Sequence, residues 1–144
     1  MSLRNPTSKM SKSDPSDQSR INLTDSPDLV RSKLARAQTD SIRGISFDPV
    51  NRPGVANLLS IQAELEGRSI EQVVQDLESV QSNKALKERV TEAVIESLKP
   101  IQSEISRLKR DPGYVQKVLD DGAEKARSVA SHNLKECYKA IGLD

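Results

Sequence analysis

The chain has 144 residues, of which 35% are hydrophobic and 30% charged, and its formal net charge is +1. This length predicts one domain with a moderate core, and the small net charge excludes a global field that would attract a polyanion. Aromatic residues make up only 2% of the chain, so the core must be aliphatic, which favours packed helices. The single cysteine excludes an intramolecular disulfide, and no apolar run is long enough for a membrane-spanning helix.

Residues 1–25 lack the apolar periodicity of a helix and contain the pentapeptide KMSKS at 9–13. The basic, serine-rich composition of the first twenty residues is compatible with a disordered tail, a transit peptide or a phosphate-handling loop. Acidic residues and prolines within this segment count against a transit peptide. Two lysines three residues apart, with serine and backbone N–H groups between them, could bring mobile positive charge to a polyphosphate. By composition alone, a segment of this kind is more often a basic, serine-rich tail than a phosphate-handling loop.

Beyond residue 25 the sequence predicts helices, and the longest irregular stretch between them is 39–54, with two prolines and two glycines at its turns. Ser26-Pro27 and Asp111-Pro112 each combine an N-cap with a proline at the first helical position. Ser69 and Gln72 have the spacing of a capping box, and apolar residues then recur at intervals of three and four. Pro100 should kink its helix without ending it. The predicted helical segments are 26–37, 55–66, 69–77, 82–110 and 111–141, and Gly67 should end the second of them.

The last of these segments carries a long apolar stripe that includes Val118, Val129 and Cys137. We therefore expect the stripe to be buried, with Cys137 packed in the core. Gly122 interrupts the stripe at a cost of about 1 kcal/mol relative to alanine, and this favours close approach of another helix there. A surface position is expected for His132, the only histidine.

Few residues have the types or spacing that chemistry requires. One histidine and one cysteine cannot form a structural zinc site, so no metal site is predicted. No glycine-rich phosphate cradle is present. Two groups of basic residues lie on predicted helices and could either face solvent or contact a nucleic-acid backbone. These groups are Arg107, Lys109 and Arg110, followed by Lys125, Lys135 and Lys139.

The pentapeptide matches the signature loop of class I aminoacyl-tRNA synthetases, and further segments strengthen the match. MSLRNPTSKMSKSDP (1–15), LTDSP (23–27), FDPVNRPGVANLL (47–59) and VLDDGAEKAR (118–127) resemble tryptophanyl-tRNA synthetases in order and spacing. The resemblance covers essentially the whole chain. It implies a mainly α fold: residues 1–25 would end a nucleotide-binding domain and carry the KMSKS loop, and residues 26–144 would form a C-terminal helical domain of the anticodon-binding type.

The resemblance also implies a reaction, in which tryptophan and ATP, with Mg²⁺, form tryptophanyl-adenylate and the acyl group then passes to tRNA(Trp). Lys9 and Lys12 would be the catalytic residues that stabilise the triphosphate. Met10, Ser11 and Ser13 would complete the ATP-binding loop with backbone and hydroxyl contacts. Members of the family are homodimers, so a homodimer is expected for the full-length enzyme. No individual anticodon contact can be assigned.

Members of the family carry a Rossmann-type half before this loop, and the 144 residues contain neither that half nor a HIGH-like motif. We therefore expect a C-terminal part of an enzyme that is inactive in isolation. A non-catalytic helical module that binds tRNA or a protein is the alternative. The link at 78–90 has no Gly or Tyr, which favours the mitochondrial type and the mitochondrial matrix over a bacterial cytoplasm. Lys12 argues against the type found in eukaryotic cytosol.

Overall fold

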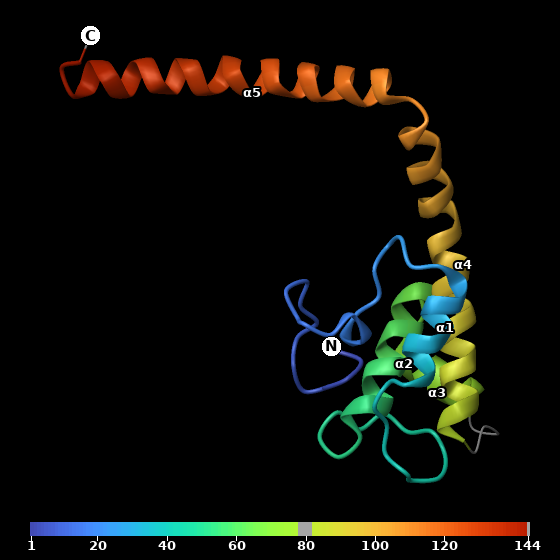
Figure 1. Cartoon of the computed structure of the whole chain (residues 1–144). Coiled ribbons are helices and arrows are strands. Elements are labelled where there is room, and N and C mark those ends of the chain that lie inside the picture. The colour runs from blue at the N-terminus through green and yellow to red at the C-terminus, as the bar shows by residue number, and fades with distance from the viewer. Residues whose placement is uncertain (78–81, 144) are drawn as a thin grey trace. The chain divides into compact units, whose positions relative to one another are not determined.

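The computed structural model of the chain describes residues 1–77 and 82–143 (Figure 1). A short 3-10 turn, η1, is followed by five α-helices, and no strand occurs in the described residues. The prediction of a mainly α fold is therefore confirmed. The elements are η1 (Asp17–Ser19), α1 (Pro27–Ala35), α2 (Pro53–Glu66), α3 (Ile70–Asp76), α4 (Asn83–Lys109) and α5 (Pro112–Ala140).

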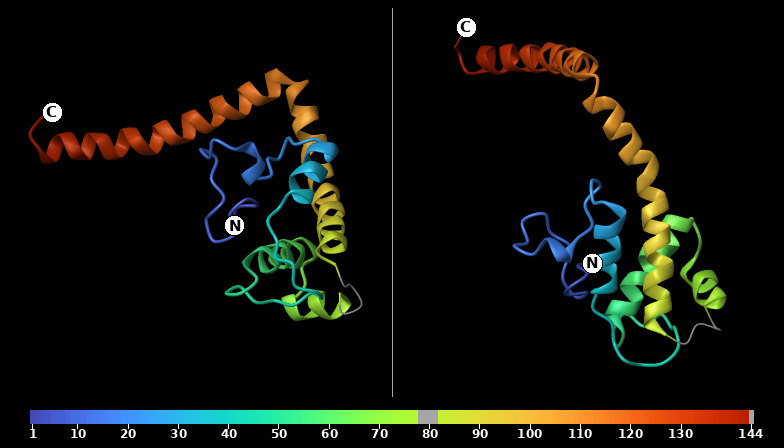
Figure 2. Two further views of the ribbon diagram at one scale, coloured as in Figure 1. Left: turned by 60° about the horizontal axis from the view of Figure 1, so that its bottom comes forward. Right: turned by 45° about the vertical axis from the view of Figure 1, so that its right-hand side comes forward.

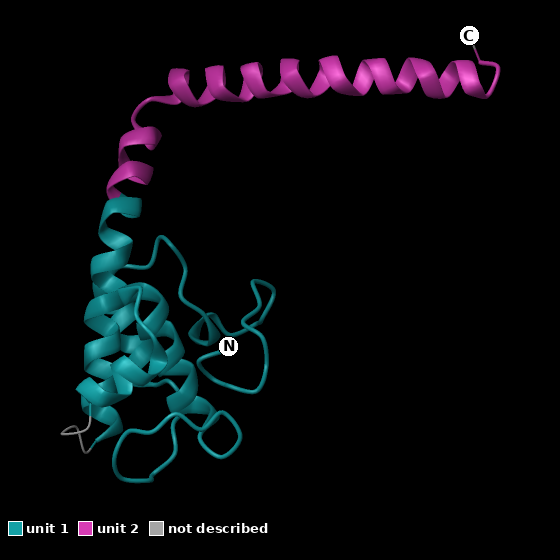
Figure 3. Cartoon of the chain, turned by 180° about the vertical axis from the view of Figure 1, so that it is seen from behind, with its two compact units in different colours: residues 1–102 teal, residues 103–144 magenta. Residues whose placement is uncertain are grey.

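The chain divides into two compact units, Met1–Gln102 and Ser103–Asp144, which Figure 3 colours separately. The boundary between the units falls within α4. The predicted division into residues 1–25 and 26–144 remains a prediction. None of the helices in the described part of the chain combines the length and hydropathy that a membrane crossing requires.

The first unit is built on an aliphatic core. Helices α1, α2 and α4 lie side by side in Figures 1 and 2, and α3 packs against α2. Their buried side chains form one cluster, which also contains Leu3 from the N-terminal segment. The helical members of this cluster are Val30, Leu34, Val55, Leu58, Leu59, Ala63, Val73, Leu86, Val90, Val94, Ile95 and Leu98.

The N-terminal segment is folded against this core. Leu3 is 1% exposed; its N–H donates to the carbonyl of Ser19 at 2.9 Å, and its own carbonyl accepts from the N–H of Gln38 at 2.8 Å. Met10 and Ile21 also pack on the hydrophobic cluster. These long-range contacts are those of a folded segment, so the alternative of a disordered tail over the first twenty residues is wrong.

The predicted helix ends are confirmed in detail. The Ser26 hydroxyl accepts from the N–H of Leu29 at 3.3 Å, and the Asp111 carboxylate accepts from that of Tyr114 at 3.0 Å. Ser69 and Gln72 form the capping box with both bonds present, and Gly67 ends α2 with a φ of 62°. As predicted, α4 continues through Pro100.

The expectation of a buried stripe on α5 is wrong. No residue of α5 is buried; Leu119 is 60% and Val129 63% exposed. Cys137 is likewise exposed instead of packed in a core, and a Cβ at Gly122 would meet nothing within 4 Å. The spacing of the apolar residues determines where the helix and its apolar face lie, but that face is buried only if another element packs on it. The second unit consists of the end of α4 and α5 and, in its described residues, offers α5 no such partner.

Close approach to a glycine occurs instead at the start of α2. A Cβ on Gly54 would lie 2.1 Å from the backbone oxygen of Gln38, well inside van der Waals contact. Glycine at this position therefore lets the segment after α1 pass directly over the first turn of α2.

Candidate functional site

The pentapeptide at residues 9–13 forms a turn on the surface of the first unit. Lys9, Ser11, Lys12 and Ser13 are exposed, and Met10 is half-buried against the core. Among the residues that the structure describes, no carboxylate lies within ion-pair distance of either lysine. The two ammonium groups are therefore available to an anionic ligand.

The hydroxyl groups of the turn face one another. The Ser11 and Ser13 Oγ atoms are 3.0 Å apart, and the N–H of Ser13 donates to the Ser11 hydroxyl at 3.3 Å. The N–H of Asp14 donates to the Ser11 carbonyl at 3.4 Å. These short-range bonds give the turn its shape, while Met10 is the one residue of the pentapeptide that the core holds.

A buried lysine binds carboxylates of the segment that follows this turn. Lys33 extends from α1 and is 0% exposed, and its Nζ atom lies 2.6 Å from Asp25 Oδ2 and 2.6 Å from Asp17 Oδ2. Burial by itself would lower the pKa of Lys33, but the hydrogen bonds to Asp17 and Asp25 outweigh it and raise that pKa. The ammonium is thus held charged between two carboxylates.

The two carboxylates are held ionised by the same contacts. Burial would raise the pKa of Asp25, but hydrogen bonds from Lys33 and Asn22 lower it overall. The hydrogen bond from Lys33, followed by that from Asn22, likewise lowers the pKa of Asp17. The guanidinium of Arg20 completes the set with an ion pair to Asp17 at 3.0 Å.

No sequence motif marks this ionic network as part of the site. One signal was available, because Lys33 falls between Val30 and Leu34 on the face of α1 that enters the core. A charged residue on a buried face requires buried partners. The identity of those partners depends on how residues 14–25 fold back over α1. A local sequence pattern does not predict such a chain reversal.

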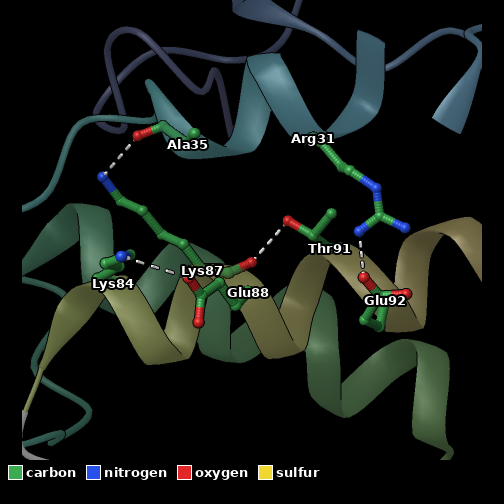
Figure 4. A pocket seen from close by; sticks show the side chains of 7 residues that line it. All are labelled: Arg31, Ala35, Lys84, Lys87, Glu88, Thr91 and Glu92. Carbon is green, nitrogen blue, oxygen red and sulfur yellow. Dashed lines mark hydrogen bonds and ion pairs between the residues drawn. The ribbon is translucent and has the colours of Figure 1, made fainter. Parts of the chain in front are cut away.

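A separate cavity of about 720 Å³ opens between α1 and α4 (Figure 4). Its charged groups are mostly paired with one another: Arg31 with Glu92, and Lys84 with Glu88 at 3.8 Å. Burial lowers the pKa of the remaining cation, Lys87, whose Nζ donates to the Ala35 carbonyl at 3.3 Å. With its cations engaged in this way, the cavity offers less free positive charge than the turn at 9–13.

The basic residues of the second unit are exposed, as a solvated surface or a phosphate contact would require. Arg107 is bonded to the Glu104 carboxylate at 2.6 Å and lies over the Tyr114 ring, 5.6 Å from its centroid. His132 is on the surface as expected. The described residues contain no group of His, Cys, Asp and Glu side chains that could hold a metal ion.

Comparison with known proteins identifies the class of this chain. Residues 1–99 match the family model of class I tRNA synthetases (W and Y), and the chain belongs to this family. The curated relatives that it matches are tryptophan–tRNA ligases. One from a Nostoc species is 42% identical over 99% of this chain and 42% of its own length, and the mitochondrial enzyme of Saccharomyces cerevisiae is 40% identical over 99% and 38%.

A solved structure shows the same similarity in three dimensions. Tryptophanyl-tRNA synthetase from Mycoplasma pneumoniae superposes with a TM-score of 0.81 at 33% identity, over 100% of this chain and 45% of that protein. The resemblance expected from the sequence motifs is thereby confirmed. The chain spans about two fifths of the length of the relatives that it matches.

Proposed function

We propose that this chain is the part of a tryptophan–tRNA ligase that supplies the KMSKS loop and the helical domain. The observation that carries the proposal is the exposed turn at 9–13, with both lysines free of carboxylate partners among the described residues, on a chain whose curated relatives are tryptophan–tRNA ligases. Residues 1–25 would end the nucleotide-binding domain, and residues 26–144 would form the domain that receives tRNA(Trp).

The chemistry assigned to the turn is electrostatic. A carboxylate oxygen of tryptophan attacks the α-phosphorus of ATP, the bond from that phosphorus to the bridging oxygen breaks, and pyrophosphate leaves with the electron pair. Negative charge grows on the phosphate oxygens as this happens, so cations placed there lower the barrier. Lys9 and Lys12 would supply these cations, and Met10, Ser11 and Ser13 would place them. Mg²⁺ would accompany the ATP as part of the substrate.

The remaining assignments follow from the same family membership. We expect tryptophan and tRNA(Trp) as substrates, and a homodimer for the full-length enzyme. Relatives named as mitochondrial and relatives from bacteria are similarly close to this chain. The lack of Gly and Tyr at 78–90 is therefore the reason to propose the mitochondrial matrix, with the bacterial cytoplasm as the alternative.

The test uses tryptophan-dependent exchange of pyrophosphate into ATP. The 144 residues alone should give no exchange above background, because they match only about two fifths of an active relative. A hybrid in which they replace the corresponding part of the Nostoc enzyme should be active. A folded hybrid without exchange activity would contradict the proposal. Turnover by the isolated chain would contradict the expectation that the 144 residues are inactive without the rest of the enzyme.

Single substitutions in the hybrid then test the two lysines. Lys9→Ala or Lys12→Ala should lower kcat about 10²-fold or more and leave the KM for tryptophan nearly unchanged, because the charge acts on the transition state. Lys117→Ala, a change at an exposed lysine of α5, is the matched control and should have no effect. Equal effects on kcat and on tryptophan binding would remove the role given to Lys9 and Lys12.

A further inference from the structure

The side chain of Arg20 binds two backbone carbonyl groups at the returning end of the turn at 9–13. Its Nη1 atom donates to the carbonyl of Asp14 at 3.1 Å and to that of Ser11 at 3.5 Å. Its Nε atom donates to Asn22 Oδ1 at 3.3 Å, and its Nη2 atom pairs with Asp17 Oδ1 at 3.0 Å. A planar guanidinium with several fixed donors can serve all these acceptors at once, which an ammonium cannot.

One acceptor of Arg20, the Asp17 carboxylate, is itself held by a residue of α1. Asp17 uses Oδ1 for Arg20 and Oδ2 for Lys33 at 2.6 Å, and the same Lys33 ammonium binds Asp25, which is 5% exposed. Asn22 donates to both carboxylates, at 2.9 Å and 3.1 Å. The buried Lys33 thus binds Asp17, Asp17 binds Arg20, and Arg20 binds the carbonyl groups of the turn.

We propose that Arg20 is the positioning residue of the loop at residues 9–13, because it fixes the returning end of that loop to the ionic network formed by Asp17, Lys33 and Asp25. The leading end is fixed separately, because Met10 packs on the hydrophobic core. Lys12 lies between these two attachments and Lys9 lies before them. Arg20 therefore determines mainly where the Lys12 ammonium stands. The effect on catalysis rests on the proposed function; the effect on the loop does not.

The first experiment measures the loop in this chain, independently of any reaction. Backbone order parameters for residues 10–14 should fall from a rigid value of about 0.85 to below about 0.6 in Arg20→Lys, which keeps the charge but loses the fork of donors. Amides of α2 and α4 should be unchanged. Arg4→Lys is the control, because Arg4 is an exposed arginine of the same segment. Unchanged order parameters at 10–14, or a uniform loss that includes α2 and α4, would overturn the proposal.

The second experiment places the role in the reaction, in the Nostoc hybrid. Arg20→Lys should lower kcat for pyrophosphate exchange about tenfold with the KM for tryptophan unchanged, and it should have little further effect in a Lys12→Ala background. Additive effects of the two substitutions would show that Arg20 does not act through Lys12. An inactive hybrid would count against the proposed function, whereas the order parameters would still decide whether Arg20 holds the loop.

Discussion

Helices α4 and α5 have the same kind of sequence and opposite surroundings. Both carry apolar residues at intervals of three and four, and both are long. Leu86 and Val90 on α4 are 0% exposed, whereas Leu119 and Val129 on α5 are 60% and 63% exposed. An amphipathic pattern therefore predicts which face of a helix is able to be buried, and only a packing partner makes that burial happen.

The largest effect that would test this contrast comes from truncating one leucine on each helix. Leu86→Ala should lower the free energy of unfolding by about 3 kcal/mol, through lost burial and the cavity left behind. Leu119→Ala should change it by less than about 0.5 kcal/mol, because that side chain is already in solvent. Urea denaturation followed by circular dichroism measures both. A comparable loss from Leu119→Ala would show that α5 is packed in solution.

A second, smaller contrast lies between two glycines. Gly54→Ala should destabilise the chain by about 2 kcal/mol, because a Cβ would stand 2.1 Å from the Gln38 oxygen and the backbone must shift. Gly122→Ala should stabilise α5 by up to about 1 kcal/mol, because nothing lies within 4 Å and alanine favours the helix. Thermal unfolding of the two variants and of the unsubstituted chain measures these changes in stability. Stabilisation by Gly54→Ala would refute the close approach at α2.

The smallest expected effect is the dependence of stability on pH. The folded-state pKa of Asp25 is lowered, so its contribution to stability is present above its unfolded value of about 3.9 and is lost as the pH falls through the folded value. The raised pKa of Lys33 adds stability that is lost only in strong alkali. The free energy of unfolding should therefore fall between about pH 5 and pH 2.

Asp25→Asn provides the comparison for this acid transition. The variant lacks the titrating carboxylate, so its stability at neutral pH should be lower and its decline between about pH 5 and pH 2 less steep. Asp28→Asn, at an exposed aspartate three residues further on, serves as the control and should retain the full slope. Identical slopes for Asp25→Asn and the unsubstituted chain would mean that the pairing with Lys33 does not set the acid transition.

Some of the candidate site could be predicted from the sequence and some could not. Lys9 and Lys12 stand out because a short motif names both residues and their spacing. Arg20 and Asp17 do not, because their partners lie on Ser11, Asp14 and the helix α1, and each of these contacts depends on a chain reversal. The identity of a side chain is local information, whereas the group that it binds is not.

The sequence by itself determined the helices, their caps and the end of α2 at Gly67, since capping bonds and left-handed glycines act over a few residues. It also placed the loop motif that marks the family. Only the tertiary structure decided that Lys33 is buried between two carboxylates, that Gly54 and not Gly122 is the crowded glycine, and that the stripe of α5 stays exposed. These outcomes depend on which distant segments come together, and the period of a single helix does not contain that information.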